Sequence, residues 1–413
     1  MGRVLLLLPT ATYRAPDFLA AASRLGVEVV VGSERRQAMA RAMGDRAVVV
    51  PMAAPEAAVE AIAQLHRRTP LDAVLAVDDQ GIVVAARAAE RLGFRHNPPD
   101  AVAATRDKIT MRRKLEATSV PQPPFREVPP GADASAAAAD LGYPCVIKPT
   151  SRSASQGVIR VDDDTQAGLA VARIQAILGD CPEPLVVEQF VPGAEVAVEG
   201  LLVDGELEVL AVFDKPDPLD GPYFEETIYV TPSRHSPSTL AAVEALTARA
   251  AEALGLREGP VHAEMRIGAA GEVTMLELAA RSIGGLCSRS LRFGVGVSLE
   301  EVILRHALGM GLDGLTRETQ ASGVMMLPIR SAGVLERVTG QQEARAVDGV
   351  VGLEISVPMG REVVPLPEGD RYLGFLFARG ETAAEVEAAL RQAESLLEVQ
   401  LAPVPVGGSA RPQ

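Results

Sequence analysis

Four short apolar runs divide the first hundred residues, separated by Ala- and Arg-rich stretches. The runs are nearly continuous in apolar side chains rather than alternating, which is typical of strands buried on both faces of a parallel sheet. They stand at residues 4–8, 27–32, 47–51 and 73–77. We therefore predict a βαβ module, with a parallel sheet between helices, at the start of the chain.

This first module lacks the glycine signature of a dinucleotide-binding fold. That fold needs G-x-G-x-x-G after the first strand, whereas this chain has Pro-Thr-Ala-Thr-Tyr at residues 9–13. Asp78 and Asp79 follow the fourth run, at the edge where open α/β sheets bind ligands. Two interpretations of this pair stay open, a substrate contact and an N-cap of the next helix.

The distribution of prolines and apolar runs predicts three domains. Seven prolines between residues 97 and 131 break the βα rhythm. The last ninety residues read as an α+β unit, with strands near 323–329, 352–357 and 373–378 and a helix at 382–397 that opens with a Thr382/Glu385 capping box. The expected domains are 1–97, 98–320 and 321–403, followed by a loose tail at 404–413.

Charge and cysteine content exclude several classes of protein. Forty basic against 54 acidic residues give a formal net charge of −14, so no overall positive field attracts a nucleic acid. The three cysteines have neither disulfide-framework nor zinc-ligand spacing. The opening apolar run, residues 4–9, is too short for a membrane span or a signal peptide. We expect a cytoplasmic protein that binds neither nucleic acid nor membranes.

Two alternating runs around a short Gly/Ala-rich turn, residues 261–267 and 273–281, predict a β-hairpin. We expect Glu264 to lie opposite Met275 and diagonal to Glu277, so that both carboxylates share one face. The other face is expected to enter the core through Val261, Ala263, Met265, Ile267, Thr274, Leu276 and Leu278.

The two carboxylates repel each other unless a cation lies between them. A divalent metal is the natural partner, and hard oxygen ligands favour Mg²⁺ or Mn²⁺ over Zn²⁺. The same face carries His262, Arg266 and Arg281. For this reason a solvated strand face, with arginines as partners of Glu264 and Glu277, stays open as the alternative.

A candidate phosphate site lies upstream. Lys148 ends the apolar run 144–149, and small hydroxylated residues follow at 150–158. A lysine beside such a loop can bind a phosphate, together with loop amides and hydroxyls. The loop has one glycine, Gly157, and does not match the P-loop pattern. Lys108 opens a basic helical stretch whose simplest interpretation is a solvated face.

The stretch 185–200 reads as a buried strand, a turn and a second strand. At the end of the first strand, backbone groups of Glu188, Gln189 and Phe190 can meet the edge of an adenine. Glu195, seven residues after Glu188, is then placed to reach ribose hydroxyls.

Taken in order, these residues resemble the series found in ATP-grasp enzymes. The resemblance covers about residues 97–320, and the first module resembles the domain that precedes the ATP-grasp domain in this superfamily. It implies an ATP-grasp fold between a Rossmann-like αβ domain and a C-terminal α+β domain. The matching series is Lys108, Lys148, Glu188-x-x-Val191, Glu195, Glu264 and Glu277-x-x-x-Arg281.

The resemblance also implies which residues bind ATP. Lys108 and Lys148 would hold the α- and β-phosphates. The loop that closes over the triphosphate would use Ser153, Ser155, Gln156 and Gly157. The adenine and ribose contacts would come from Glu188, Gln189, Phe190, Val191 and Glu195.

For the metals, the resemblance implies that Glu264 and Glu277 hold two Mg²⁺ (or Mn²⁺) ions that bridge the phosphates. The chain departs from the family at one position. An Asn commonly stands two residues after the second metal carboxylate, and this chain has Ala279. Glu226 is our candidate for the missing ligand.

Catalytic and substrate contacts follow from the same resemblance. Arg281, with the amides of Gly284 and Gly285, would stabilise the transferred phosphate and the tetrahedral intermediate. Arg289 and Arg292 are candidates for binding a substrate carboxylate through two parallel hydrogen bonds, and an exposed arginine pair is the alternative.

Within the superfamily, the chain most resembles the L-amino acid ligases. The stretch LELAARSIGG at 276–285, the FEET element at 224–227 and the C-terminal extension carry this resemblance. Tyr229 stands where some of these ligases have His, and we include Tyr229 and His262 among candidate substrate contacts.

The implied function is an ATP-dependent carboxylate–amine ligase that forms an amide or dipeptide bond through an acyl phosphate and releases ADP and phosphate. By the same resemblance, its partners would be small carboxylates and amines of the amino acid class, and it would form a homodimer. Two alternatives stay open at this point. One is a carboxylase-type enzyme that activates bicarbonate, and the other is a non-catalytic ATP-binding protein.

Overall fold

The computed structural model describes residues 2–9, 12–35 and 44–404. The chain divides into two compact units. The first comprises residues 1–123, 193–213 and 234–319, and the second comprises residues 124–192, 214–233 and 320–413. The domain boundaries at 97 and 320 that the sequence suggests stay a prediction. Of the expected tail at 404–413, only Val404 belongs to the described residues.

The first unit begins with the predicted parallel sheet, in the order β3-β2-β1-β4. Its strands are β1 (Arg3–Leu7), β2 (Glu28–Ser33), β3 (Ala47–Val49) and β4 (Ala73–Ala76). Its helices are α1 (Ala15–Leu25), α3 (Pro55–Arg68) and α4 (Ile82–Leu92). In the segment 9–13 after β1, which lacks the glycine signature, Thr10 and Ala11 lie outside the described residues.

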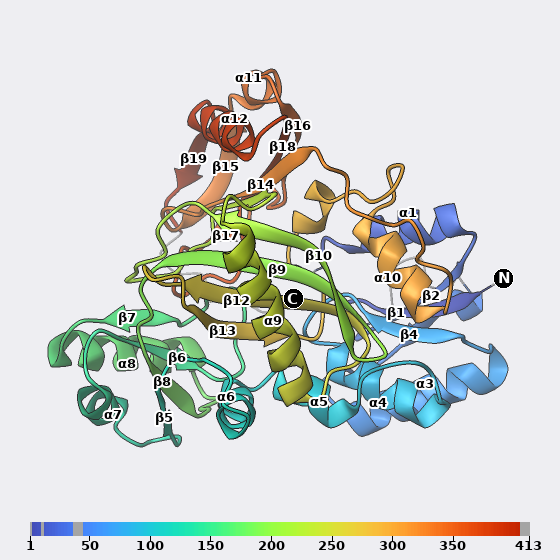
Figure 1. Ribbon diagram of the computed structural model, residues 1–413, viewed down its shortest axis with the longest axis horizontal. Coiled ribbons are helices and arrows are strands. Elements are labelled where there is room, and N and C mark those ends of the chain that lie inside the picture. Colours follow the sequence, from blue (N-terminus) through green and yellow to red (C-terminus); the bar gives the residue numbers. More distant parts are fainter. Residues whose placement is uncertain (1, 10–11, 36–43, 405–413) are drawn as a thin grey trace. The chain divides into compact units, whose positions relative to one another are not determined.

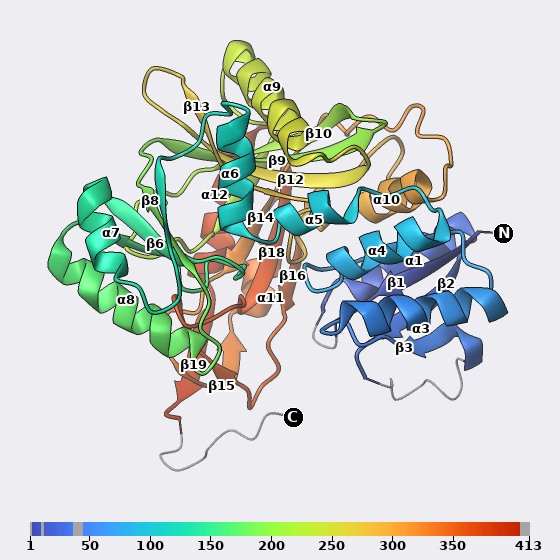
Figure 2. The same ribbon diagram turned by 90° about the horizontal axis from the view of Figure 1, so that it is seen from below.

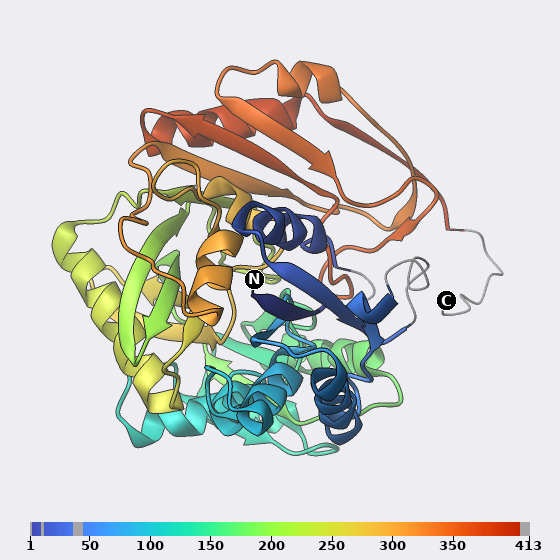
Figure 3. The same cartoon turned by 90° about the vertical axis from the view of Figure 1, so that its right-hand side faces the viewer.

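Helices cover both faces of this sheet, as continuous apolar strands require. Figures 1 and 2 show α3 and α4 on one face and α1 on the other, beside α10 (Leu299–Ala307). Figure 3 shows the same layers from the side, with the dark-blue α1 across the strands from the lighter blue helices. A 3-10 turn at Gly44–Arg46 leads into β3.

The rest of the first unit is an antiparallel sheet in the order β13-β12-β9-β10. Its strands are β9 (Ala194–Val203), β10 (Glu206–Lys215), β12 (Gly259–Ile267) and β13 (Val273–Ala279). The accompanying helices are α5 (Pro99–Ala104), α6 (Lys108–Ala117) and α9 (Pro237–Leu254), and a 3-10 turn follows at Cys287–Ser290.

One face of this antiparallel sheet is the core, and α6 and α9 pack on it. Apolar residues at helical spacing, such as Leu115 of α6 and Val243 and Ala250 of α9, are fully buried against Val198 and Ala263. The polar side chains of β9, β12 and β13 therefore gather on the opposite face.

A β-bulge sets the register of the predicted hairpin. Met265 pairs with Met275, but Glu264 pairs with Glu277, so Leu276 is the extra residue on β13. The expected pairing of Glu264 with Met275 is therefore wrong, and the two carboxylates lie directly opposite each other. The core face of β13 also differs from the expectation, because Met275 and Leu278 are fully buried and Leu276 is only half-buried.

The second unit contains an antiparallel sheet in the order β5-β8-β6-β7. Its strands are β5 (Phe125–Val128), β6 (Cys145–Pro149), β7 (Ile159–Val161) and β8 (Leu185–Gln189). Two helices supply the apolar cover of one face, α7 (Ala134–Leu141) and α8 (Asp164–Leu178). Asp133 and Asp163 cap these helices by accepting hydrogen bonds from backbone N–H groups of the first turn.

The C-terminal part of the second unit is α+β, as the sequence predicts. Four of its strands are neighbours in the order β11-β14-β18-β16, and three others form a sheet in the order β17-β15-β19. The strands are β11 (Ile228–Thr231), β14 (Ala321–Leu327), β15 (Gly333–Thr339), β16 (Val350–Ile355), β17 (Glu362–Val363), β18 (Gly374–Gly380) and β19 (Glu398–Ala402). The helices are α11 (Gln341–Arg345) and α12 (Ala383–Ser395), and α12 opens with the predicted capping box of Thr382 and Glu385.

Within the residues that the structure describes, no helix combines the length and the apolar character that crossing a membrane requires.

The bulge predicts which side chains of β13 stabilise the fold. Met275→Ala should lower the free energy of unfolding by about 2–5 kcal/mol, because it empties a core position. Leu276→Ala should cost clearly less, because Leu276 is only half-buried. Urea unfolding followed by circular dichroism measures both changes. A larger loss for Leu276→Ala than for Met275→Ala would contradict the bulged register.

Candidate active site

Glu264 and Glu277 form the centre of the polar face in the first unit. They are direct cross-strand neighbours on β12 and β13. The ammonium of Lys108 lies 3.7 Å from Oε2 of Glu277, and Nε2 of His262 lies 3.5 Å from Oε1 of Glu264. Lys108 is only 7% exposed, so its interpretation as part of a solvated face is wrong. A lysine ammonium and a histidine ring thus lie close to the two carboxylates.

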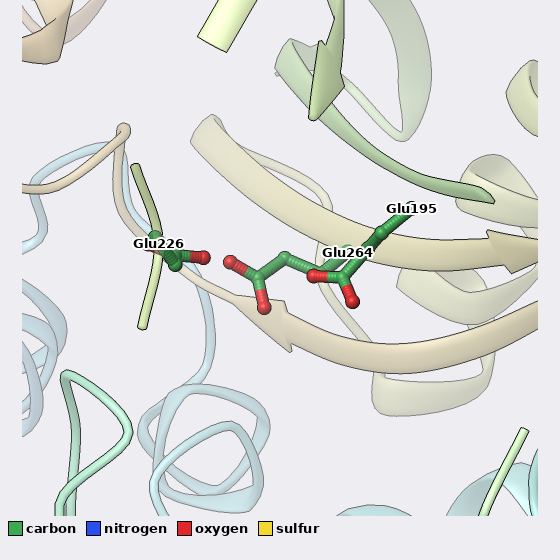
Figure 4. Close-up of side chains that lie close together, drawn as sticks. All are labelled: Glu195, Glu226 and Glu264. Atoms are coloured by element: carbon green, nitrogen blue, oxygen red, sulfur yellow. The ribbon is translucent and has the colours of Figure 1, made fainter. Parts of the chain in front are cut away.

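Glu195 on the neighbouring strand β9 adds a third carboxylate to this face. Its Oε2 lies 2.8 Å from Nε of Arg266, which is its register partner on β12. Figure 4 shows Glu195 and Glu264 side by side on these strands, and one oxygen of each lies within 4.8 Å of the other. Closely spaced carboxylate oxygens are the donors that Mg²⁺ and Mn²⁺ prefer, so this set of residues fits a hard divalent cation.

Arg281 is oriented by Asp79. Its Nε donates to Oδ1 of Asp79 at 2.7 Å and its second terminal nitrogen donates to Oδ2 at 3.2 Å. Burial disfavours the charged guanidinium, but the carboxylates of Asp79, Glu277 and Asp78 together outweigh burial and hold the pKa of Arg281 above its ordinary value. Two parallel hydrogen bonds fix the plane of the guanidinium as well as its position.

The start of α4 decides between the two interpretations of Asp78 and Asp79. The helix that follows, α4, has Gly81 as its N-cap and no side-chain capping bond. N-capping by either aspartate is therefore wrong, and a substrate contact stays a prediction. The pair is missed by sequence reasoning because Asp79 and Arg281 are 202 positions apart and neither motif points to the other.

Buried groups also hold the segment that follows Arg281. Arg14 donates to the hydroxyl of Ser282 at 2.6 Å, and the backbone N–H of Ile283 donates to Oε2 of Glu199 at 2.8 Å. Arg14 is 2% exposed and Glu199 is fully buried. Sequence reasoning missed both, because nothing in the sequence separates a buried Arg or Glu from a surface one. Gly285, with φ of 58°, takes a left-handed conformation that favours glycine.

Arg289 and Arg292 each have contacts within the first unit. Nε of Arg289 lies 2.8 Å from Oδ2 of Asp17. Arg292 donates to the carbonyl oxygens of Arg289 at 3.1 Å and Leu291 at 2.6 Å. Both arginines are half-buried, so they are not the exposed pair of the alternative interpretation. Their role in binding a substrate carboxylate stays a prediction.

In the second unit, Lys148 and Glu188 form a buried ion pair on neighbouring strands. The ammonium of Lys148 lies 2.7 Å from Oε2 of Glu188, and the residues are 8% and 3% exposed. Glu188 therefore fixes the position of the lysine that we expect to bind phosphate.

At the end of β8, the backbone N–H groups pair with prolines. The N–H groups of Gln189 and Phe190 donate to the carbonyl oxygens of Pro124 at 2.9 Å and Pro144 at 3.1 Å. Proline has no N–H, so neither proline can donate back to its partner's carbonyl. Any backbone hydrogen bond between these two residues and adenine would therefore use their carbonyl oxygens, because their N–H groups are already bonded. Val191 follows them directly in the chain.

The 150–157 loop turns sharply although it has a single glycine. Ala154 and Ser155 both adopt φ near 55° (54° and 55°), a left-handed conformation that non-glycine residues rarely take. The loop is held near its end, where Gln156 donates to the carbonyl of Glu368 at 2.8 Å and the N–H of Gly157 donates to that of Pro367 at 2.9 Å. The carbonyl of Ser153 accepts a hydrogen bond from the N–H of Gln156 within the loop.

Glu226 and Tyr229 belong to another polar cluster of the second unit. Oε1 of Glu226 lies 2.6 Å from the ammonium of Lys215 and accepts a hydrogen bond from the hydroxyl of Tyr229 at 2.6 Å. Tyr229 is 2% exposed. The metal contact of Glu226 and the substrate contact of Tyr229 stay predictions.

Comparisons with known protein families match three consecutive parts of the chain. Residues 19–96 match the ATP-grasp N-terminal domain, residues 141–290 match the ATP-grasp domain, and residues 325–402 match the L-amino acid ligase C-terminal domain 2. An ATP-grasp domain implies that the chain binds ATP with a divalent metal.

Individual relatives agree with these domains. Alanine–anticapsin ligase of Bacillus subtilis is 26% identical over 269 residues, which cover 60% of this chain and 56% of that protein. The chain thus spans little more than half the length of this relative. D-Alanine–D-alanine ligase of Cupriavidus necator is 27% identical over 236 residues, covering 54% of this chain and 70% of that protein.

The crystal structure of L-amino acid ligase from Bacillus licheniformis superposes with a TM-score of 0.81 and 25% identity, over 97% of this chain and 99% of that one. With its N-terminal, central and C-terminal parts matched in chain order, the protein belongs to the ATP-grasp superfamily, and its C-terminal domain is of the L-amino acid ligase type.

Proposed function

We propose that this protein is an ATP-dependent carboxylate–amine ligase that joins amino acids through an amide bond and releases ADP and phosphate. The observation that carries the proposal is the pair of opposed carboxylates, Glu264 and Glu277, beside Lys108 on one face of the sheet. Mg²⁺ or Mn²⁺ is the metal that we propose for them.

The chemistry explains why such a face is useful. A carboxylate is a poor electrophile, and its oxygen is a poor leaving group. Transfer of the γ-phosphoryl group of ATP to the carboxylate gives an acyl phosphate, which an amine attacks with loss of phosphate. Phosphoryl transfer depends mainly on positioned charges rather than on a protein nucleophile. The acidic and basic side chains described above are positioned charges of this type.

In the first unit, Glu264 and Glu277 would hold the metal ions, which neutralise charge on the phosphates. Lys108 would contact a phosphate, and Glu195 would bind the ribose. Arg281, fixed by Asp79, would stabilise charge on the transferred phosphate and on the tetrahedral intermediate, together with the amides of Gly284 and Gly285.

In the second unit, Lys148 would contact phosphate oxygens while Glu188 keeps it in place. The loop at 150–157 would cover the triphosphate and exclude water from the acyl phosphate. The carbonyl of Gln189 is suited to accept a hydrogen bond from the amino group of adenine, because its facing residue Pro124 has no N–H.

The proposed substrates are amino acids. The named relatives are ligases of alanine, D-alanine and L-amino acids, and they support this class of substrate for the present chain. Arg289 and Arg292 are the proposed contacts of the substrate carboxylate, and homodimerisation is proposed from the family resemblance.

An array of amino acid pairs tests the proposed function. Purified protein with ATP and Mg²⁺ should release phosphate with particular pairs, and mass spectrometry should detect one dipeptide for each phosphate. ATP hydrolysis stimulated by bicarbonate without amino acids would identify a carboxylase-type enzyme instead. ATP binding without turnover on any pair would identify a non-catalytic protein.

We predict that Glu277→Gln abolishes metal-dependent turnover while the protein stays folded. The substitution keeps the shape of the side chain but removes one of the charges that hold the metal. Phosphate release at increasing Mg²⁺ measures turnover, and the thermal melting temperature measures folding. The matched control is Glu272→Gln, on the exposed turn of the same hairpin. Turnover by Glu277→Gln at the rate of this control would remove the metal assignment.

Lys148→Ala should raise the KM for ATP by about 10- to 100-fold, the loss expected for a hydrogen bond to a charged group. Steady-state kinetics with varied ATP measures this change. Arg126→Ala is the control, because Arg126 is an exposed cation of the same sheet that pairs with Asp140. A KM for ATP equal to that of the control would place the phosphates elsewhere.

A further inference from the structure

Glu199 is a buried carboxylate to which the proposed mechanism gives no role. It lies on β9 and is fully buried. Its Oε2 accepts a hydrogen bond from the N–H of Ile283 at 2.8 Å and lies 3.3 Å from Nδ1 of His262. Its Oε1 has no hydrogen-bond partner among the residues that the structure describes. Burial raises the pKa of Glu199 above its ordinary value, although its partners act in the opposite direction.

Stability alone does not explain a carboxylate at this position. Removing a charge from water costs several kcal/mol, and an apolar residue of similar size often replaces a buried ion pair without loss of stability. The residues before and after Glu199 on β9, Val198 and Gly200, are uncharged and buried. The role of Glu199 therefore lies in the contacts that it makes.

One contact leads to the metal carboxylates. His262 is the register partner of Glu199 on β9 and of Ala279 on β13. Its Nδ1 faces Glu199, and its Nε2 lies 3.5 Å from Oε1 of Glu264. Ala279 has no polar atom in its side chain to hold the imidazole from the other strand. Glu199 is thus the carboxylate that fixes the ring beside Glu264.

The other contact leads to the catalytic arginine. Ile283 stands two residues after Arg281 and directly before Gly284 and Gly285. Its N–H donates to the same oxygen of Glu199 that faces His262. A single buried oxygen therefore touches both the strand that carries Glu264 and the segment that carries Arg281.

We propose that Glu199 is a positioning residue of the ligase site: through His262 it orients the carboxylate of Glu264, and through Ile283 it holds the segment that carries Arg281. This inference rests on the proposed function. Carboxylates that orient a histidine beside a metal help to position the metal ligands. Their loss typically costs about 10- to 100-fold in metal affinity or activity.

The chain offers a matched control. His306, which is buried, and Glu258, which is half-buried, form a second His–Glu pair in the first unit, with Nε2 of His306 3.1 Å from Oε2 of Glu258. The same oxygen of Glu258 lies 2.9 Å from Nε of Arg95. Neither residue has a role in the proposed mechanism. A variant of this pair reports what the loss of a His–Glu contact outside the proposed site does to the fold.

The experiment compares Glu199→Gln, His262→Asn and their double variant with Glu258→Gln. Electron paramagnetic resonance of free Mn²⁺ measures metal binding in the presence of ADP, and steady-state kinetics gives kcat and the KM for ATP. We expect Glu199→Gln to weaken Mn²⁺ binding and to lower kcat, each by about 10- to 100-fold, with a KM for ATP near that of the wild type. Glu258→Gln should keep both wild-type values.

The double variant separates a chain of contacts from two independent effects. If Glu199 acts on Glu264 through His262, the double variant should bind Mn²⁺ no more weakly than the weaker single variant. Fully multiplicative losses would contradict the proposed path. Should Glu199→Gln fail to fold, His262→Asn carries the test alone, with the same expected loss of Mn²⁺ affinity.

Wild-type Mn²⁺ affinity and kcat in the folded variants would overturn the inference and leave the proposed function intact. Failure of the wild-type protein to bind Mn²⁺ with ADP at all would instead contradict the proposed function, and the inference with it. The two failures are therefore distinguishable in one set of measurements.

Discussion

Two like charges held directly opposite each other dominate the polar face of the first unit. Glu264 and Glu277 are cross-strand neighbours only because a bulge at Leu276 shifts the register of β13. Like charges in this position destabilise a sheet, so the arrangement needs positive charge nearby. Lys108 and His262 supply part of that charge, and a divalent cation would supply the rest.

Preformed ion pairs fix several other candidate ligands. Arg281 is held by Asp79, Glu195 by Arg266 and Lys148 by Glu188. Such buried pairs add little net stability, because desolvation offsets most of their attraction. Their effect is to fix the direction of long side chains before a ligand arrives, which lowers the conformational entropy that binding would otherwise cost.

Much of the fold could be predicted from the sequence, because local patterns determine it. Continuous apolar runs predicted the parallel strands, and Thr382 with Glu385 predicted the start of α12. The pairing of Glu264 with Glu277 could not be predicted, because a bulge shifts the register without a sequence signal as clear as alternation. Local patterns also do not distinguish a buried charged side chain from an exposed one, which is why Lys108 reads as part of a solvated face although it is 7% exposed.

Contacts between residues far apart in the chain also could not be predicted from the sequence. Asp79 and Arg281 are 202 positions apart, and Glu199 and Ile283 are 84 apart. Each residue has an ordinary sequence context, and only the fold brings the partners together. The resemblance to the superfamily nevertheless rests on the sequence, because it uses the order and rough spacing of the whole series from Lys108 to Arg281 rather than any single contact.

The most direct test of the central claim is a crystal structure of the protein grown with ADP and Mn²⁺, with the anomalous scattering of manganese recorded. The account predicts anomalous peaks within bonding distance of the carboxylate oxygens of Glu264 and Glu277, with the nucleotide phosphates on the same ions. A nucleotide bound with its metal away from both carboxylates would contradict it.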